Sequence, residues 1–347
     1  MARGPRPGGP KGKQMENNKK ITIQDVADAL NVSKTTVSRA ISGKGRVGDK
    51  TRNMVLQYIE EHGYVPSATA KGLAQSRTYN IGLTIPEDSA LVDLAFFRRC
   101  MAGVCNYAGS VDYDVIITMT SNKNIQQLSR MINNSKVDGV IVSRTLVDDA
   151  PVRLLKEKGI PFVTIGSSRD NGVIQIDNDH EAACNMMTAM LIRQGLKKLA
   201  LLCGDSSHVV TNSRKRGFES AMHEAGVKNL EDYIYEDVSG NLLARAVEDI
   251  LEKEYDCIIC MDDSICVEVL EKLKCENVSV PDDIKVASFY NSSVLEHYTP
   301  SITSLKFDAK ELGMTACKTL MNIIDGKEVA DRTLLGYEIS MKESTKN

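Results

Sequence analysis

Tryptophan is absent from this chain of 347 residues, and aromatic side chains make up only 5% of it. A carbohydrate site built on tryptophan stacking is therefore excluded. No apolar run reaches the ~20 residues that a membrane-spanning helix needs. Residues 1–20 also lack the apolar stretch of a secretory signal peptide, so we expect a cytoplasmic protein with no membrane partner.

Sequence patterns that carry enzyme chemistry are missing as well. The five histidines show no spacing that suits a metal ion. Neither a G-x-S-x-G nucleophile motif nor a Walker motif is present. Asp262 and Asp263 are adjacent carboxylates, but neighbours on one helical turn rarely face each other. We therefore expect no enzyme activity, no catalytic residue, no metal site and no cofactor.

The nine cysteines are odd in number, and most of them lie in apolar runs. Reduced thiols in a cytosolic protein fit this usage best. Cys257 and Cys260 form a C-x-x-C motif inside such a run. We expect two strand thiols packed in the core, with redox or metal chemistry as the alternative.

Charge is distributed unevenly along the chain. Residues 1–77 hold 14 Lys and Arg against 6 Asp and Glu, whereas residues 78–347 hold 29 against 40. A basic head on an acidic body is typical of a protein that holds a polyanion at one end. A disordered basic tail is the alternative, but residues 21–77 alone keep a net charge of +3.

The length and the changes in composition predict several domains. The N-terminal tail is rich in Gly, Pro, Lys and Arg and cannot bury a core, so we expect it to be disordered. The predicted divisions are a basic tail (1–20), a helix-turn-helix domain (21–66), a hinge helix or linker (67–79) and a ligand-binding and dimerisation domain (80–347).

Three short helices are predicted in the helix-turn-helix domain. Thr22 caps the first, with an aspartate three residues later, and Ser33 caps the second. Asp49 opens the third helix, which ends at Gly63. Residues 43–48 match G-x-G-x-x-G, but they follow a helix, so we expect a loop over DNA phosphates and not a dinucleotide site.

The outward face of the second predicted helix is polar. An α-helix fits the DNA major groove, where each base pair shows a distinct pattern of donors and acceptors. Arg39 is long enough to hold a guanine with two hydrogen bonds, and the hydroxyls of Ser33 and Thr36 suit phosphates. A small helical bundle with a polar face is the alternative. The expected DNA contacts from this segment are Ser33, Lys34, Thr35, Thr36, Ser38 and Arg39.

Alternating β and α patterns after residue 80 predict an α/β body with doubly wound parallel sheets. Two consecutive sets predict two lobes, with the chain crossing near 177 and 303 and a ligand cleft between them. The expected strands are 81–85, 115–118, 139–142, 162–165, 199–203, 257–261 and 286–290. The expected helices are 94–108, 124–135, 179–194, 213–225, 241–253 and 263–274.

The head also resembles a known family. Between residues 22 and 73 it is similar, without a gap, to the heads of lac repressor (LacI/GalR) family regulators. Two departures are Asn31, where the family has a turn glycine, and Ser67, where it has an asparagine. The matching stretches are 22–27, 32–33, 36–39, 50–52, 63–66 and 70–73.

This resemblance implies a sequence-specific DNA-binding transcriptional regulator. We expect a repressor that binds double-stranded operator DNA as a homodimer. Leu73 matches a hinge leucine that the family inserts into the minor groove, Lys71 would lie near a DNA backbone, and Arg52 belongs to the matched head. A plain linker with Leu73 docked on the body is the alternative.

The body resembles the periplasmic sugar-binding-protein fold that completes this family. That fold implies a small-molecule effector, either a sugar or a related metabolite. Arg214 matches the arginine that grips the ligand, and Phe96 and Phe97 match an aromatic lining. Asp262 and Asp263 match an acidic pair. Core packing by the two phenylalanines and helix capping by Asp263 are the alternatives.

One departure concerns the effector. Where sugar-responsive members carry an aspartate after an apolar strand, this chain has Tyr290 followed by Asn291. A phenol offers one hydroxyl in place of an anion that accepts two hydrogen bonds. A ligand with its own negative charge, a nucleobase stacked on Tyr290, or a polar role for Asn291 are the open alternatives.

Two rival functions come from other classes. A receptor whose head docks on a protein would lack salt-dependent DNA affinity. A sugar-modifying enzyme with a fused head would turn over a small molecule. The absence of a catalytic constellation and the presence of the hinge motif speak against this enzyme.

Overall fold

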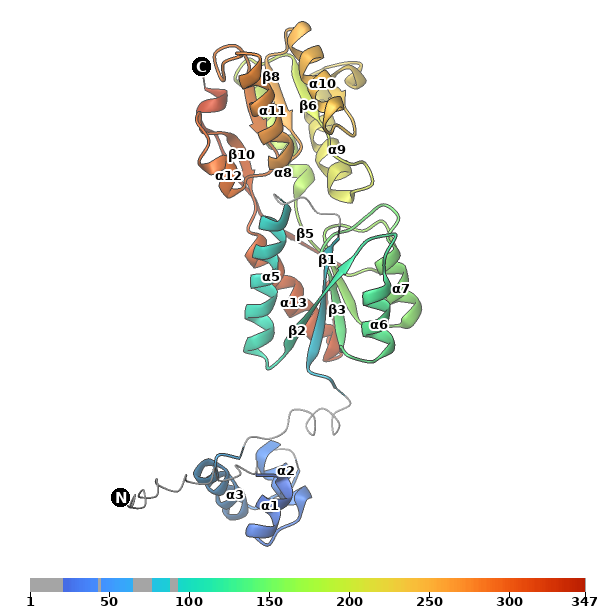
Figure 1. The fold of residues 1–347 in the computed structure, drawn as a ribbon, viewed down its shortest axis with the longest axis vertical. Coiled ribbons are helices and arrows are strands. Elements are labelled where there is room, and N and C mark those ends of the chain that lie inside the picture. The colour runs from blue at the N-terminus through green and yellow to red at the C-terminus, as the bar shows by residue number, and fades with distance from the viewer. Residues whose placement is uncertain (1–20, 43–44, 65–76, 88–92, 347) are drawn as a thin grey trace, which may run out of the picture. The chain divides into compact units, whose positions relative to one another are not determined.

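The computed structural model describes residues 21–42, 45–64, 77–87 and 93–346 (Figure 1). The chain divides into two compact units, residues 1–76 and 77–347. The predicted tail and two predicted DNA contacts, Lys71 and Leu73, lie outside the described residues. Within those described segments, no helix combines the length and the apolar character needed to cross a membrane.

The first unit contains the three predicted helices. The capping role predicted for Thr22 is confirmed, because its hydroxyl accepts the Asp25 N–H and the Asp25 carboxylate accepts the Thr22 N–H at 2.8 Å. Asn31 has φ = 51°, the left-handed conformation for which a glycine was expected. Gly63 ends the third helix at φ = 62°. The helices are α1 (Ile23–Ala29), α2 (Lys34–Ser42) and α3 (Asp49–His62).

The inward faces of these three helices meet in one small core. Val26, Val37 and Val55, one from each helix, are fully buried. Burying a valine side chain stabilises a fold by about 1.5 kcal/mol or more. Because Val37 must point inward, the polar side of α2 must point outward.

The first lobe of the body is a six-stranded parallel sheet of order β11-β5-β4-β3-β1-β2. Helices α5 (Asp93–Ser110) and α13 (Ala309–Ile324) cover one face, and α6 (Gln126–Asn133) and α7 (Ala150–Lys158) cover the other (Figure 1). The strands are β1 (Asn80–Pro86), β2 (Asp114–Thr120), β3 (Gly139–Val142), β4 (Phe162–Ile165), β5 (Gln175–Asn178) and β11 (Arg332–Leu335).

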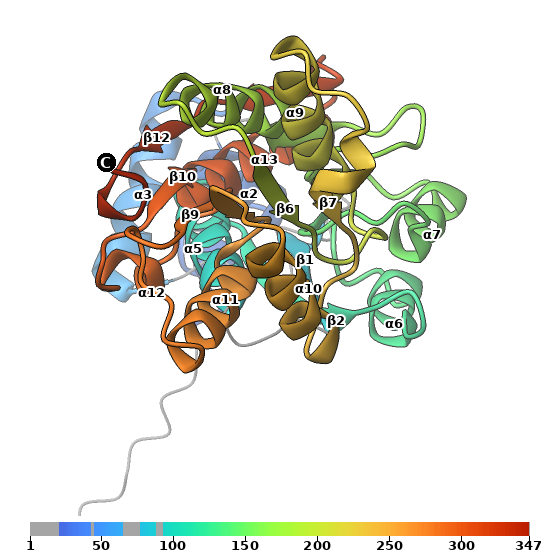
Figure 2. The same ribbon diagram turned by 90° about the horizontal axis from the view of Figure 1, so that it is seen from above.

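The second lobe is a sheet of order β12-β10-β9-β8-β6-β7, parallel except for β12. Figure 2 shows α8 (His180–Arg193) and α9 (Val209–Glu224) on one side of it, and α10 (Asn241–Glu252) and α11 (Asp263–Cys275) on the other. The short α12 (Ser293–Glu296) follows β9. The strands are β6 (Leu199–Leu202), β7 (Ile234–Tyr235), β8 (Cys257–Cys260), β9 (Lys285–Ser288), β10 (Thr303–Lys306) and β12 (Glu338–Ser340).

Strand β8 carries both thiols of the C-x-x-C motif. Cys257 and Cys260 are free and fully buried, which confirms the prediction of packed strand thiols. Burial raises the pKa of the Cys257 thiol, so it stays protonated. Among the described residues, no cluster of His, Cys, Asp or Glu is placed to hold a metal ion.

The chain passes between the lobes three times. It crosses from β5 to α8, from β10 to α13, and from β11 to β12. Crossings near 177 and 303 were expected, and the third was not. Each lobe is therefore assembled from separate stretches of chain.

Two glycines let α5 and α13 pack backbone to backbone. A Cβ atom on Gly103 would lie 2.0 Å from the Lys310 carbonyl oxygen. One on Gly313 would lie 2.1 Å from the Cys100 carbonyl oxygen. This contact fixes α5, which carries Phe96 and Phe97, against the lobe.

Candidate DNA-binding helix and effector cleft

Helix α2 presents its predicted polar face to the outside. Val37 and Ala40 are fully buried in the head core. Thr36 is half-buried between the two faces. The predicted DNA contacts that are exposed are Ser33, Lys34, Thr35, Ser38, Arg39 and, on α3, Arg52.

Local contacts hold the start of this helix. The Ser33 hydroxyl accepts the Thr36 N–H at 3.1 Å and lies 2.9 Å from the Thr36 hydroxyl. This confirms Ser33 as a helix cap. At Gly45, where φ is +91°, a Cβ would lie 3.1 Å from Arg39 Cδ, so the backbone of Gly45 packs along the arginine stem.

A cavity of about 470 Å³ opens between the two lobes of the body. Small-molecule sites have volumes of this size, and in open α/β sheets they lie at the carboxyl ends of strands. The first lobe contributes Phe96, Phe97, Ser143, Asp177 and Asn178 to the lining, and the second contributes His180, Arg214, Asp262, Asp263 and Tyr290.

Arg214, on α9, is only 7% exposed and has two fixed partners. Its Nη1 donates to the Met261 carbonyl oxygen at 2.7 Å, and its Nε donates to His180 Nδ1 at 3.4 Å. Helix α9 begins at Val209 and not at the predicted residue 213, so Arg214 lies within its second turn. A guanidinium has five N–H donors, which leaves donors for a ligand.

Tyr290 joins aromatic side chains from both lobes. Its ring centre lies 6.0 Å from that of Phe96, edge to face, and 6.4 Å from that of Phe307, nearly parallel. Phe96 in turn contacts Phe97 at 5.3 Å. Burial raises the pKa of Tyr290, so its hydroxyl is neutral and can both donate and accept.

Asp262 and Asp263 differ in environment. Asp262 caps α11 by accepting the Ile265 N–H at 2.9 Å, so the alternative that Asp263 is the cap is wrong. Asp263 is 2% exposed, and its Oδ2 has no hydrogen-bond partner among the described residues. Burial raises the pKa of Asp263 because the charged form loses water.

Two other buried oxygens of the cavity lining also lack a hydrogen-bond partner among the described residues. Asn178 Oδ1 and Ser143 Oγ also have no partner within the described part of the chain. Leaving a buried polar group unpaired costs about 1–3 kcal/mol. The lining is therefore prepared for a molecule that brings hydrogen-bond donors.

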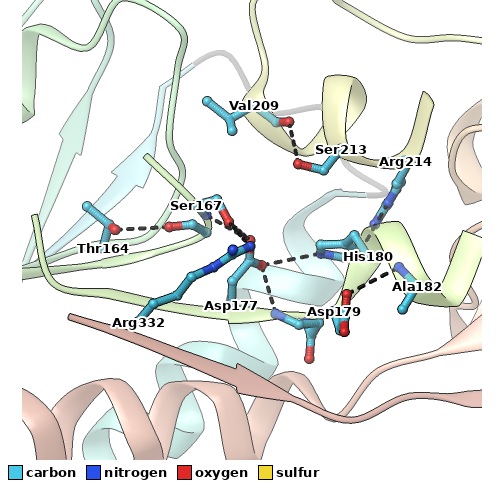
Figure 3. A network of polar contacts seen from close by, with 12 residues as sticks. Thr164, Ser167, Asp177, Asp179, His180, Ala182, Val209, Ser213, Arg214 and Arg332 are labelled. Carbon is cyan, nitrogen blue, oxygen red and sulfur yellow. Dashed lines mark hydrogen bonds and ion pairs between the residues drawn. The ribbon is translucent and has the colours of Figure 1, made fainter. Parts of the chain in front are cut away.

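A polar network runs along the crossing from β5 to α8 (Figure 3). Asp177 Oδ2 accepts the backbone N–H and the hydroxyl of Ser167, each at 2.7 Å. Asp177 Oδ1 lies 3.4 Å from His180 Nε2. Arg332 donates to the Ser167 hydroxyl at 3.3 Å. The network thus connects lobe 1 to Arg214 in lobe 2 through His180.

Known proteins match both units of the chain. Residues 22–67 match the bacterial regulatory proteins of the lacI family, and residues 188–345 match the periplasmic binding protein-like domain. The HTH-type transcriptional repressor PurR of Vibrio parahaemolyticus is 30% identical over 339 residues, which cover 94% of this chain and 98% of PurR. This chain belongs to the lacI family of bacterial regulatory proteins.

As a lacI-family member, the protein is a DNA-binding transcriptional regulator with a periplasmic-binding-protein-like effector domain. Catabolite control protein A of Priestia megaterium is 29% identical over 336 residues, 94% of this chain and 99% of that protein. The structure of the regulator CelR with cellobiose superposes with a TM-score of 0.70 at 26% identity, covering 93% of this chain and 99% of CelR. The lac repressor dimer bound to operator and the anti-inducer ONPF shares the fold, with a TM-score of 0.75 over 94% of this chain and 99% of that one.

The effector residues expected in this lacI-family regulator line the cavity, with one exception. Asn291 does not, and its Nδ2 donates to Glu296 at 3.0 Å. Sequence reasoning missed Ser143 and His180 as lining residues. His180 was considered only as a metal ligand, and its position three residues after Asp177 was the signal that could have placed it at the crossing.

Proposed function

We propose that this lacI-family regulator is an operator-binding repressor controlled by a small molecule in the cleft. One observation carries the proposal. A single chain combines a capped helix with an exposed polar face and a two-lobed cavity with unsatisfied buried oxygens. The first feature suits DNA, and the second suits an effector.

In this proposal α2 enters the major groove of the operator. Arg39 reads a guanine, while Lys34 and Thr35 reach base edges near the start of the helix. The hydroxyls of Ser33 and Thr36, together with Ser38, contact the DNA near the helix N-terminus. Arg52 and Lys71 contact the DNA backbone, and Leu73 enters the minor groove.

For the effector we propose a small polyhydroxyl compound. Hydroxyl groups supply the donors that Ser143, Asn178 and Asp263 lack, and such a ligand can also accept from Arg214. A ligand with its own negative charge is disfavoured, because Asp262 and Asp263 lie in the same wall. Phe96, Phe97 and Tyr290 cover the apolar side of the ligand. CelR, a relative of this chain, binds cellobiose.

We also propose a homodimer, because two symmetric heads match two operator half-sites. Strand β2 forms an edge of the lobe-1 sheet. Ile117 is 48% exposed and Met119 is 37% exposed on this strand, an apolar edge that a second copy would cover. The helix expected at residues 94–108 forms most of α5, which contacts β2 and would extend this dimer face.

The effector acts by changing how the two lobes are oriented. Closing the cleft rotates one lobe against the other, and in a dimer this changes the spacing of the two hinge segments. Operator affinity then depends on occupancy of the cleft.

The test is a genome-wide DNA pull-down with purified protein, compared with Arg39→Ala. Arg153→Ala, an exposed arginine on α7 of the body, is the matched control. We expect one palindromic motif whose two half-sites lie roughly one helical turn apart. The wild type and the control should both enrich this motif, and Arg39→Ala should not. Binding without a motif, or a motif that survives Arg39→Ala, would bring the protein-docking receptor forward.

Oligomeric state is tested separately by light scattering of Ile117→Glu with Met119→Glu. We expect a monomer that keeps its circular dichroism spectrum, because both side chains are exposed in the single chain. A dimer in this double variant would place the interface elsewhere.

A further inference from the structure

The side chain of Arg214 is held at two points by groups that are not ligand. The Met261 carbonyl holds Nη1 at 2.7 Å, and His180 Nδ1 holds Nε at 3.4 Å. Two contacts on different nitrogens fix both the position and the rotation of a planar guanidinium. The Met261 carbonyl belongs to the backbone that follows β8, so only the contact to His180 depends on another side chain.

The hydrogen-bond pattern determines the protonation state of His180. Nδ1 accepts a hydrogen bond from the Arg214 Nε–H and therefore carries no proton. The proton is then on Nε2, which faces Asp177 Oδ1 at 3.4 Å. A protonated ring would turn a second N–H toward Arg214 and place two cations in contact.

The surroundings of His180 favour the same neutral form. Its side chain is buried and meets the Phe307 ring edge to face at 4.6 Å between ring centres. Burial and the positive charge of Arg214 lower the pKa of His180, and the carboxylates of Asp177 and Asp179 oppose this only in part.

Close packing of two helices brings the pair together. Gly217 lies one turn after Arg214 on α9, and a Cβ there would be 2.4 Å from the Glu181 carbonyl oxygen on α8. Without that side chain, the α9 backbone approaches the first turn of α8. Since His180 opens α8 directly after the crossing from lobe 1, it meets the Arg214 side chain.

We propose that His180 is a positioning residue, a neutral imidazole that sets the orientation of Arg214 and ties it to lobe 1 through Asp177. Asp177 lies on β5 of lobe 1, whereas His180 and Arg214 lie on α8 and α9 of lobe 2 (Figure 3). A change in lobe orientation at this crossing is therefore transmitted to the guanidinium. The ligand-binding role of Arg214 rests on the proposed function, but the positioning contact does not.

Two conservative variants separate the two contacts of the imidazole. An asparagine side chain ends where Nδ1 of histidine lies, so His180→Asn can still accept from Arg214 and loses the link to Asp177. A glutamine side chain ends near Nε2, so His180→Gln can still donate to Asp177 and loses the acceptor for Arg214. His180→Phe keeps the ring packing on Phe307 and loses both.

The readout is NMR of the full chain labelled with [15N]histidine and [15N]arginine, with Arg214→Lys assigning the Arg214 signal. In the wild type we expect long-range 1H–15N correlations of a neutral, Nε2-protonated His180. The Arg214 Nε–H should keep its shift in His180→Asn. In His180→Gln and His180→Phe it should move and exchange with water about threefold to tenfold faster, the factor for losing one hydrogen bond.

Three results overturn the proposal: an Nδ1-protonated or charged His180 in the wild type, an unchanged Arg214 signal in His180→Phe, or equal effects of asparagine and glutamine. Thermal unfolding of each variant identifies a purely structural role, which would lower stability and leave the Arg214 signal in place. The wild-type spectrum decides the tautomer even if a variant fails to fold. Neither ligand nor DNA is present, so failure here is distinct from failure of the operator experiment.

Discussion

The guanidinium carbon of Arg214 lies 5.7 Å from the centre of the Tyr290 ring. An arginine within about 6 Å of an aromatic ring centre is attracted to its electron-rich face. Sugar-responsive family members carry an aspartate at this point of the sequence, whereas in this chain Arg214 meets the ring of Tyr290. The cleft keeps a partner for Arg214 without a further negative charge beside Asp263.

The ring of Tyr290, more than its hydroxyl, should stabilise the body. We expect Tyr290→Phe to change the free energy of unfolding by less than about 1.5 kcal/mol. Tyr290→Ala should lower it by about 2–4 kcal/mol, because the contacts to Phe96 and Phe307 disappear. Urea unfolding measures both. Equal losses in the two variants would show that the hydroxyl carries the effect.

Removing the buried charge of Asp263 should stabilise the empty protein. Its folded pKa is raised, so the folded state holds the proton more tightly and stability falls as pH rises from about 4 through the folded pKa. Asp263→Asn should therefore be as stable as the wild type or more stable, by up to about 1–2 kcal/mol at pH 7. Asp262→Asn keeps a good capping residue and serves as the matched control. A destabilised Asp263→Asn at pH 7 would contradict the assignment of a buried carboxylate with one unpaired oxygen.

Acidification should destabilise the body in two separate steps. The pKa of His180 is lowered on folding from 6.5, so the unfolded chain binds a proton first and stability declines as pH falls below 6.5. The pKa of Asp177 is also lowered by its hydrogen bonds and His180, although burial opposes this, so its contribution is lost only as pH falls below 3.8. Thermal unfolding between pH 8 and pH 3 should show both steps. His180→Asn should lack the first one, and an identical profile in that variant would exclude His180 as its source.

The two glycines Gly103 and Gly109 lie on the same helix and should respond oppositely to alanine. At Gly103 the new Cβ would meet a carbonyl oxygen at 2.0 Å, and we expect a loss of about 2–3 kcal/mol. At Gly109 nothing lies within 4 Å, and higher helix propensity should add about 0.4–1 kcal/mol. Urea unfolding of both variants checks this, and a tolerated Gly103→Ala would mean that α5 and α13 can separate.

Arg52 should contribute affinity without sequence discrimination. We expect Arg52→Ala to weaken binding to all DNA sequences to a similar extent and to reduce the salt slope of binding by about one. Fluorescence anisotropy with operator and scrambled duplexes at several salt concentrations measures this. A selective loss on operator alone would instead make Arg52 a base-reading residue.

Sequence reasoning located the elements whose signal is local. The head helices carry caps and apolar spacing, and central strands such as β3 and β8 are fully apolar runs. It missed β11, whose residues alternate between exposed and half-buried, and β5, which ends in the polar pair Asp177 and Asn178. Strand β11 forms because it pairs with β5, which lies far away in the sequence, and β5 is held between β4 and β11.

The cleft shows the same limit. Motif matching placed Arg214 and Tyr290, because each belongs to a recognisable stretch. It could not place the unpaired oxygen of Asp263 or the contact from Arg214 to His180, because these depend on how α8, α9 and α11 pack. Burial and partners are properties of the fold, and no spacing along the chain encodes them.

The return of the chain from lobe 2 to lobe 1, between β10 and α13, has a consequence for how the protein is made. Because the chain is made from its N-terminus, lobe 1 has no helix α13 until residue 324 has been synthesised and no strand β11 until residue 335. During synthesis the head can fold as soon as it leaves the ribosome, but the part of the sheet face that α13 covers stays open until Ala309–Ile324 has emerged. Until then only α5 covers that face of the sheet, and part of its apolar surface stays exposed. We therefore expect lobe 1 to be the part of the nascent chain most in need of a chaperone.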